Sequence, residues 1–173
     1  MQKIGAILVS LNQGAEWNIN FYINIEMRPR CFDVNPKTGD IFLGVDTGPI
    51  GIGNQNNLFR SSDGGLTWSA RPRVGPGTLT PPSTEHPQRT QYPSIRALAH
   101  RFEGELFAGT SEGVFRSTDN WETWEDVSEG LGKRDVRAIV VTEDGTMVAG
   151  TANAGFFRST YLVAVELSTF ALD

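Results

Sequence analysis

The sequence predicts an all-β fold, a partial β-propeller of about three and a half four-stranded blades with little or no helix. Three observations support this class. Segments of the chain repeat at intervals of about 42 residues, which is within the range of propeller blades. Each repeat consists of short β-prone runs separated by Gly, Asp and Asn turns. No segment shows the sustained apolar spacing of about 3.6 residues that is typical of a helix.

Four stretches of the chain align as repeats. Residues 95–118 read IRALAHRFEGELFAGTSEGVFRST, and residues 136–160 read VRAIVVTEDGTMVAGTANAGFFRST. Their offset is 41 residues, and one residue inserted in the loop before Phe115 raises it to 42. A third copy fits residues 30–45 when Gly39 is placed under Gly104. A fainter fourth copy lies at residues 6–17.

The elements follow a fixed order within the repeat at 95–124. A β-prone stretch at 96–99 runs to a turn centred on Gly104, and a second stretch follows at 106–109. After a loop, a third stretch at 114–116 leads to a compact turn and then to Trp124. Such runs predict short antiparallel strands, about four to a unit. The apolar stretch 4–11 fits this pattern as a strand; the alternative, a signal peptide, lacks a clear cleavage site.

The compact turn contains the most distinctive motif. One copy is Ser61-x-Asp63-x-Gly65-x-Thr67-Trp68 and the second is Ser117-x-Asp119-x-Trp121-x-Thr123-Trp124, each preceded by Phe-Arg. A degenerate copy runs from Ser10 to Trp17. Ser159 opens another, in which Tyr161 stands where Asp is expected.

These motifs resemble the Asp-box, or BNR, repeat, which is found in sialidases, sortilin-type receptors, xyloglucanases, a photosystem assembly factor and bacterial surface proteins. The resemblance covers roughly residues 4–160. It implies propeller blades and an extracellular or periplasmic location. In the family the motif turns lie on the face away from the active site, which implies a structural role for them here.

The chemistry of the turn also predicts a structural role. An Asp in a tight turn accepts hydrogen bonds from nearby backbone N–H groups, Gly provides a positive φ, and Trp packs as an apolar plug between blades. A catalytic acid or a calcium ligand is the less favoured interpretation of these Asp residues. The predicted structural residues are Ser61, Asp63, Gly65, Thr67, Trp68, Ser117, Asp119, Thr123 and Trp124.

A Phe-Arg-Ser triplet precedes or opens these turns at residues 59–61, 115–117 and 157–159. Strand alternation places Phe and Arg on opposite faces, so Phe is expected in the core between blades. Arg is expected to pack its stem on a neighbouring sheet or to pair with a carboxylate. An arginine cluster that grips a substrate carboxylate, as in sialidases, is the alternative, but these positions lie beside the structural turn.

Composition excludes several classes of protein. The 173 residues have a net charge of −5 and a pI near 5.1, which argues against a general nucleic-acid binder. A single cysteine, Cys31, excludes an intrachain disulfide, and His86 and His100 cannot form a zinc site by themselves. No apolar run is long enough to cross a bilayer. No cofactor or metal is expected.

Two long loops predict the site of function. In a four-stranded blade, the loop at 46–57 and the connection at 69–94, which holds six of the nine prolines, emerge on the same face. Long loops often serve function, and a carbohydrate or a protein ligand is expected there. The alternative is that residues 71–93 form a disordered proline-rich loop. The candidate ligand-binding residues are Asp46, Asn54, Gln55, Asn56, Asn57, Glu85, His86, Arg89 and Tyr92.

The sequence favours a non-catalytic binding or interaction module over an enzyme. The alternative is a glycoside hydrolase of sialidase-like or xyloglucanase-like type, which needs two carboxylates held across the substrate. Asp46 and Glu85 are the only acids in the two loops, and no catalytic residue can be named from them. The segment 27–30, Met-Arg-Pro-Arg, resembles the Arg-Ile-Pro segment of sialidases only weakly, through Arg28.

The repeats divide the chain into a partial blade at 4–29, blades at 30–69, 95–125 and 136–170, and a proline-rich loop at 70–94. Closed propellers have about four to eight blades, so the count falls short of a ring. The expectation is therefore a piece of a larger extracytoplasmic protein or a homo-oligomer that completes the ring. The spacing of residues 161–173 predicts a strand, but these residues do not continue the Ser-x-Asp turn motif.

Overall fold

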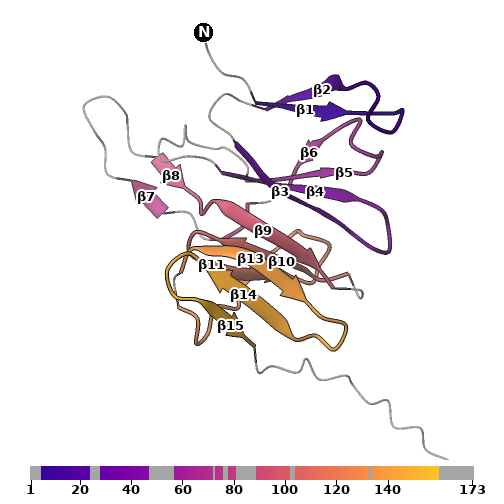
Figure 1. The fold of residues 1–173 in the computed structure, drawn as a ribbon. Helices are drawn as coiled ribbons and strands as arrows, with labels where there is room; N and C mark the ends of the chain where they lie inside the picture. The colour runs from indigo at the N-terminus through magenta and orange to yellow at the C-terminus, as the bar shows by residue number, and fades with distance from the viewer. Residues whose placement is uncertain are drawn as a thin grey trace, which may run out of the picture.

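The computed structural model describes residues 5–23, 28–46, 57–71, 73–75, 78–80, 89–101, 104–132 and 134–159, which form five antiparallel sheets (Figure 1). The first sheet pairs β1 (Gly5–Val9) with β2 (Asn18–Ile23). The second contains β3 (Arg28–Val34), β4 (Ile41–Asp46), β5 (Leu58–Ser61) and β6 (Ser69–Ala70). The third contains β9 (Ile95–His100), β10 (Leu106–Thr110), β11 (Gly113–Ser117) and β12 (Glu125–Asp126). The fourth contains β13 (Val136–Val141), β14 (Met147–Thr151) and β15 (Phe156–Arg158), and the small fifth pairs β7 (Thr78–Thr80) with β8 (Arg89–Gln91).

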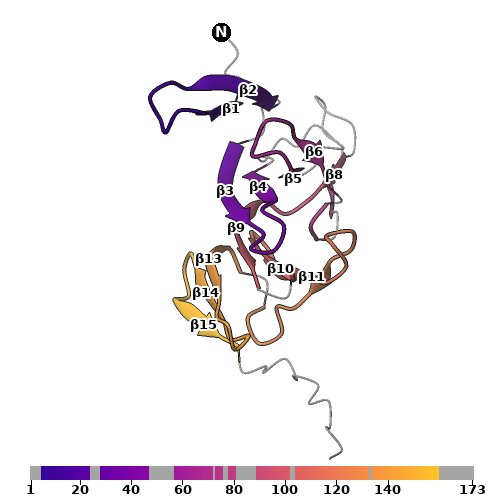
Figure 2. The ribbon, with the colours of Figure 1, turned by 90° about the vertical axis from the view of Figure 1, so that its right-hand side faces the viewer.

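The four larger sheets are stacked in chain order, as both ribbon views show (Figures 1 and 2). The first strands of the second, third and fourth sheets lie side by side, so that β9 contacts β3 on one side and β13 on the other. This is the arrangement of propeller blades around an axis lined by the innermost strands. The prediction of an all-β partial propeller with little or no helix is confirmed within the described ranges. No described segment is a helix of the length and hydrophobicity needed to cross a bilayer.

The interior strands read as continuous apolar runs because a sheet covers each of their faces. In β10 all five residues are buried, and β4 is buried from Phe42 to Asp46. β13, the inner strand of the last sheet, alternates instead, with Ile139 and Val141 half-buried and Val140 exposed between them. Burial on both faces removes the polar positions that mark a half-exposed strand.

Three apolar clusters hold the four sheets together. The first and second sheets are joined by Ile7 with Leu43, Val45 and Phe59. The second and third sheets are joined by Phe42 and Leu58 with Ile95, Leu98, Leu106, Ala108 and Phe115. The third and fourth sheets are joined by Phe107 and Val114 with Val136 and Ala149. Burying such side chains is the main favourable term for the stack. The Phe residues of the predicted Phe-Arg-Ser triplets at 59 and 115 lie in two of these clusters.

Glycine permits the close approach of sheets. A Cβ built on Gly44 would lie 2.4 Å from Cγ2 of Ile95, and one built on Gly109 would lie 2.8 Å from Cγ1 of Val136. Both distances are shorter than any real carbon contact, so only glycine fits between these strands. The alignment that places Gly39 under Gly104 also places Gly44 under Gly109.

The Ser-x-Asp turns are closed by their own side chains. Asp63 Oδ1 accepts hydrogen bonds from Ser61 Oγ at 2.7 Å and from the Thr67 N–H at 2.8 Å. Ser61 Oγ in turn accepts the N–H of Gly65 at 2.8 Å. In the second copy, Asp119 Oδ1 accepts the Thr123 N–H at 2.9 Å. These bonds link each Asp to the backbone ahead of it.

Trp121 takes the place that Gly65 has in the other turn. Its φ is +69°, in the left-handed region that favours glycine, and its side chain is 2% exposed. The ring packs 4.3 Å from that of Phe42 on the preceding sheet, and the Arg60 guanidinium lies over it at 5.2 Å. Trp68 and Trp124, which were expected to be the plugs, are only partly buried at the edges of their clusters. In the second motif turn the fully buried tryptophan is therefore Trp121.

The arginines that precede the two complete motif turns are paired with carboxylates. Arg60 Nη2 lies 2.8 Å from Asp40, and Arg116 pairs with Glu105 and Glu125. His100 is packed rather than exposed, with Nδ1 2.6 Å from Asp33 and a side chain that is almost fully buried. The predicted blade at 136–170 extends past the last described residue, and residues 161–173 lie outside the described part of the chain.

Candidate functional site

An arginine stands at the same position of the innermost strand in three successive sheets. These residues are Arg30 in β3, Arg96 in β9 and Arg137 in β13. In each strand the pairing register shifts at the arginine, between Pro29 and Cys31, between Ile95 and Ala97, and between Val136 and Ala138. Each arginine is thus the extra residue of a β-bulge, a device that re-aims a side chain.

The residue before the bulge is anchored in the core in two of the three strands. Ile95 and Val136 are both fully buried, and each rests against the glycine of the preceding sheet. The anchor holds the start of the strand, and the bulge then releases the next side chain from the alternation of the sheet. The apolar-Arg pattern at 95–96 and 136–137 therefore places these two arginines at the same level of the axis.

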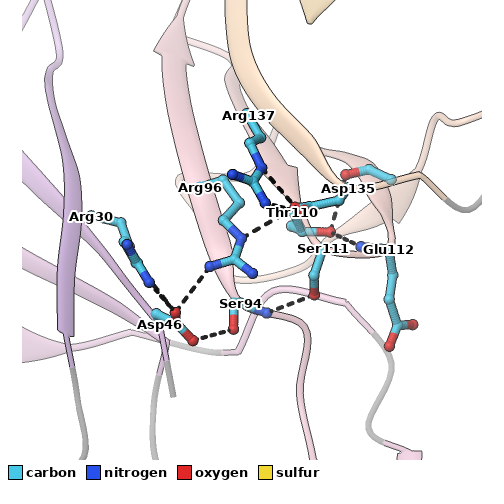
Figure 3. A network of polar contacts seen from close by, with 10 residues as sticks. Arg30, Asp46, Ser94, Arg96, Thr110, Ser111, Glu112, Asp135 and Arg137 are labelled. Atoms are coloured by element: carbon cyan, nitrogen blue, oxygen red, sulfur yellow. Dashed lines mark hydrogen bonds and ion pairs between the residues drawn. The ribbon is translucent and has the colours of Figure 1, made fainter. Parts of the chain in front are cut away.

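A chain of ion pairs joins the three arginines across the sheets (Figure 3). Asp46 Oδ2 accepts hydrogen bonds from Arg30 Nη2 at 2.6 Å and from Arg96 Nη1 at 2.9 Å. Arg96 Nε donates to Asp135 Oδ1 at 3.2 Å, and Arg137 Nη2 donates to Asp135 Oδ2 at 2.9 Å. We call these five residues the arginine cluster.

Exposure increases from the centre of the arginine cluster to its ends. The Asp46 side chain is 10% exposed, the Arg96 side chain 22%, and the Arg137 side chain 64%. Three guanidinium groups face two carboxylates, so the cluster has one positive charge in excess. Its most exposed group is a guanidinium, whose N–H fork matches a carboxylate or a phosphate.

The hydroxyl of Ser94 holds the carboxylate of Asp46, and a second hydroxyl holds the backbone of Ser94. Ser94 Oγ donates to Asp46 Oδ1 at 2.7 Å, and the Ser94 N–H donates to Ser111 Oγ at 3.1 Å (Figure 3). Ser94 precedes β9, and Ser111 follows β10. The arginine cluster therefore lies on the face where the inner strands begin, which is also the face of the two long loops.

The predicted ligand-binding residues fall into different places. Asp46 is the centre of the arginine cluster. Asn57 is fully buried, and its amide bonds the N–H and C=O of Val74 and the C=O of Pro93, so it ties together the ends of both loops. Tyr92 lies under the guanidinium of Arg73, 4.7 Å from ring centroid to Cζ.

The remaining predicted residues are not brought together by the described structure. Arg89 begins β8. Five of them lie outside the described residues: Asn54, Gln55, Asn56, Glu85 and His86. Arg28 opens β3 and stands opposite Asp46 in the strand register.

Sequence reasoning missed Arg30, Arg96 and Arg137 as a group. The signal was present in the apolar-Arg pairs at 95–96 and 136–137. The alignment that put Gly39 under Gly104 placed Arg30 opposite Ile95, whereas the strand registers make Arg30 equivalent to Arg96. One extra residue in the turn between β3 and β4 accounts for the slip.

Little in the described structure points to covalent or metal chemistry. Burial raises the pKa of Cys31 to about 12, so its thiol stays protonated at neutral pH. His100 faces Asp33 between two sheets rather than a cavity. Within the described ranges, no three His, Cys, Asp or Glu residues come together in a group that could hold a metal ion.

The stacked sheets and their packing define a β-propeller protein with a charged face at the inner-strand starts. The sequence matches no protein-family model and no curated protein. Among solved structures it is similar to YCF48 bound to D1 peptide, with 18% identity and a TM-score of 0.49 over 88% of this chain and 42% of that chain. It is also similar to the extracellular domain of the one-component system BT4673 from B. thetaiotaomicron, with 15% identity and a TM-score of 0.35. That match covers 77% of this chain and 21% of the other, so the chain spans less than half the length of either protein.

Proposed function

We propose that the chain is a non-catalytic binding module built from Asp-box blades, with its ligand held over the arginine cluster. The observation that carries the proposal is the recurrence of an arginine at the bulge of three inner strands. A bulge at one equivalent position in three sheets aims three guanidinium groups at one region. Binding residues presented by a rigid scaffold are typical of propellers.

The chemistry of the arginine cluster favours a protein ligand with an acidic segment. Guanidinium groups bind carboxylates through paired hydrogen bonds, and the cluster has more arginines than aspartates. Because the three arginines come from three sheets, a ligand that contacts all of them must extend along the face. A peptide segment has this shape. A carbohydrate held by the long loops is the competing ligand, and Arg73 stacked on Tyr92 is the feature that favours it.

A non-catalytic role is supported by the state of Asp46. A glycosidase acid must deliver a proton to the leaving oxygen. Oδ2 of Asp46 already accepts from Arg30 and Arg96, and Oδ1 accepts from Ser94. Both oxygens are therefore engaged in holding sheets together. Glu85, the other acid in the glycoside hydrolase hypothesis, lies outside the described residues.

A binding screen tests the proposal. The whole chain would be applied to a peptide array with acidic, neutral and basic members, and to a glycan array. We expect binding to acidic peptides that weakens as salt rises, because exposed charges are screened. Arg137→Gln should weaken binding about tenfold, the loss of roughly one charge-assisted contact. Arg158→Gln, which removes an exposed arginine from β15, is the matched control and should bind as the wild type does.

Two outcomes contradict the proposal. One is binding to glycans but to no acidic peptide. The other is hydrolysis of a fluorogenic sialoside that Asp46→Asn abolishes, which would favour the glycoside hydrolase. The unfolding curve of each variant would be recorded first, so that a loss of fold is not taken for a loss of binding.

A further inference from the structure

The last sheet of the stack has an apolar side that no described element covers. On this side Ala138, Gly150 and Phe156 stand opposite one another, and so do Val140, Val148 and Arg158, which is the one charged residue among these six. Phe156 is 80% exposed and Val140 55%. The other side of the same sheet packs against the third sheet. We call the five uncharged residues of this side the tail face.

The first sheet has an apolar side of its own. Leu8 and Ile19 are cross-strand partners and therefore share a face, and Trp17 precedes β2. Leu8 is 45% exposed, Ile19 53% and Trp17 61%. Ile7, on the opposite side of β1, is buried against the second sheet. We call Leu8, Trp17 and Ile19 the head face.

The tail face is equivalent in position to the faces by which the second and third sheets contact the sheet that follows them. The equivalent positions run across three strands as Cys31, Gly44 and Leu58 in the second sheet, and as Ala97, Gly109 and Val114 in the third. Leu58 and Val114 are fully buried because the next sheet lies on them. Phe156 occupies the same place with no such cover among the described residues.

The head face is equivalent in position to the faces by which the second and third sheets contact the sheet that precedes them. Trp17, Trp68 and Trp124 end the same turn motif, and Leu8 stands two residues before the motif serine, as Phe59 and Phe115 do. Phe59 and Phe115 are buried in the clusters that join their sheets to the preceding ones. Leu8 and Trp17 are the same elements without a preceding sheet in the described structure.

We propose that the head face binds the tail face of a second copy of this chain. The two faces are the two halves of an interface that the chain already makes between its own sheets, so one copy offers what the other lacks. Exposed apolar patches of this kind mark interaction sites, and aromatic residues dominate their binding energy. The contact is heterologous, so successive copies close into a ring or extend as a filament.

The inference does not depend on the proposed ligand. The arginine cluster lies where the inner strands begin, whereas the head and tail faces are the flat sides of the end sheets (Figures 1 and 3). Assembly is measured without any ligand present. A failure of assembly therefore leaves the binding proposal untouched, and the reverse also holds.

Two blocked variants test the contact. Phe156→Glu places a charge on the tail face, and Trp17→Glu places one on the head face, so that neither substituted face can form the apolar contact. We expect the wild type to gain mass with concentration in size-exclusion chromatography with light scattering. Each variant alone should remain a monomer, because every contact needs both faces. An equimolar mixture should form a dimer and nothing larger, since only one open head and one open tail remain.

Leu66→Glu is the control, because Leu66 is exposed in the turn of the second sheet and belongs to neither face. It should assemble as the wild type does. Far-UV circular dichroism and a urea titration would verify that each variant is folded; both substituted side chains are exposed, so folding should survive. A wild type that stays monomeric at all concentrations overturns the proposal. So does a variant that assembles alone, or a mixture that stays monomeric.

Discussion

Trp121 illustrates at the residue scale how packing overrides local conformational preference. A left-handed φ costs a non-glycine residue roughly 1–2 kcal/mol. Trp121 nevertheless holds φ at +69°, because its ring fills the space between Phe42 and His100. Burial of a large aromatic ring contributes more than the conformation costs.

Substitution of Trp121 separates the stabilisation from its buried ring from the cost of its left-handed conformation. Trp121→Ala should lower the free energy of unfolding by about 4 kcal/mol, since it loses the packing and keeps the strain. Trp121→Gly should lower it by about 3 kcal/mol, because glycine adopts the left-handed conformation freely. Urea unfolding of both variants measures the difference. If the glycine variant is the less stable of the two, the left-handed strain is not part of the balance.

At the element scale, the motif turns depend on an ionised carboxylate. Hydrogen bonds from the side chain and backbone of Thr67 lower the pKa of Asp63 to about 2, and Thr123 does the same for Asp119. Both groups have a pKa of about 4 in the unfolded chain. Their stabilising effect is therefore complete above pH 4 and is lost as the pH falls toward 2.

A double variant tests this pH dependence. Asn replaces Asp in the first turn, where Asn12 Oδ1 still accepts the Glu16 N–H at 2.8 Å. Asp63→Asn with Asp119→Asn should therefore keep the turns but remove two titrating groups. Between pH 4 and pH 2, its free energy of unfolding should fall less steeply than that of the wild type. Equal slopes in urea titrations across this range would show that these carboxylates do not control the acid response.

The contact between neighbouring sheets is also an element-scale property. Gly44→Ala and Gly109→Ala force a Cβ against Ile95 and Val136, and overpacking of this kind costs about 2 kcal/mol. Gly150 is the matched control, because a Cβ there would meet Ala138 at an ordinary 3.5 Å. Thermal unfolding should show lower midpoints for the first two variants and little change for Gly150→Ala. Comparable losses in all three variants would contradict the packing described for the inner sheets.

The elements that sequence reasoning predicted best are those with local causes. The turns at 61–68 and 117–124 are closed by side chains within four residues, so their motif predicts their form. The Phe residues at 59 and 115 follow from strand alternation. The burial of Trp121 depends on Phe42 of another sheet, and nothing in its own turn indicates that contact.

The candidate site was predicted only in part, because it depends on strand register. Asp46 was identified from loop length, but its partners Arg30 and Arg96 come from two strands that the alignment placed one residue out of register. Asn57 was selected for its polar side chain, which the structure uses to join the loop ends at Val74 and Pro93. Polarity in a loop does not distinguish a ligand contact from a tie between backbone segments.

At the scale of the whole molecule, the stack separates two kinds of surface. The starts of the inner strands present charge on one face, and the two end sheets present apolar sides. In the two proposals, the charged face is assigned to a ligand and the end sheets to a second copy of the chain. The recurrence of the arginines in three sheets makes the charged face a property of the repeat.

NMR of the arginine side chains tests whether the arginine cluster binds acidic ligands. The ¹⁵Nε–Hε signals would be followed while oligo-glutamate is added to the whole chain. We predict shifts at Arg30 and Arg137, whose guanidinium groups are the most exposed of the cluster, and none at Arg60 and Arg116, which pair with carboxylates beside the motif turns. Unchanged signals from Arg30 and Arg137 at saturating oligo-glutamate, or shifts confined to Arg60 and Arg116, would contradict this binding.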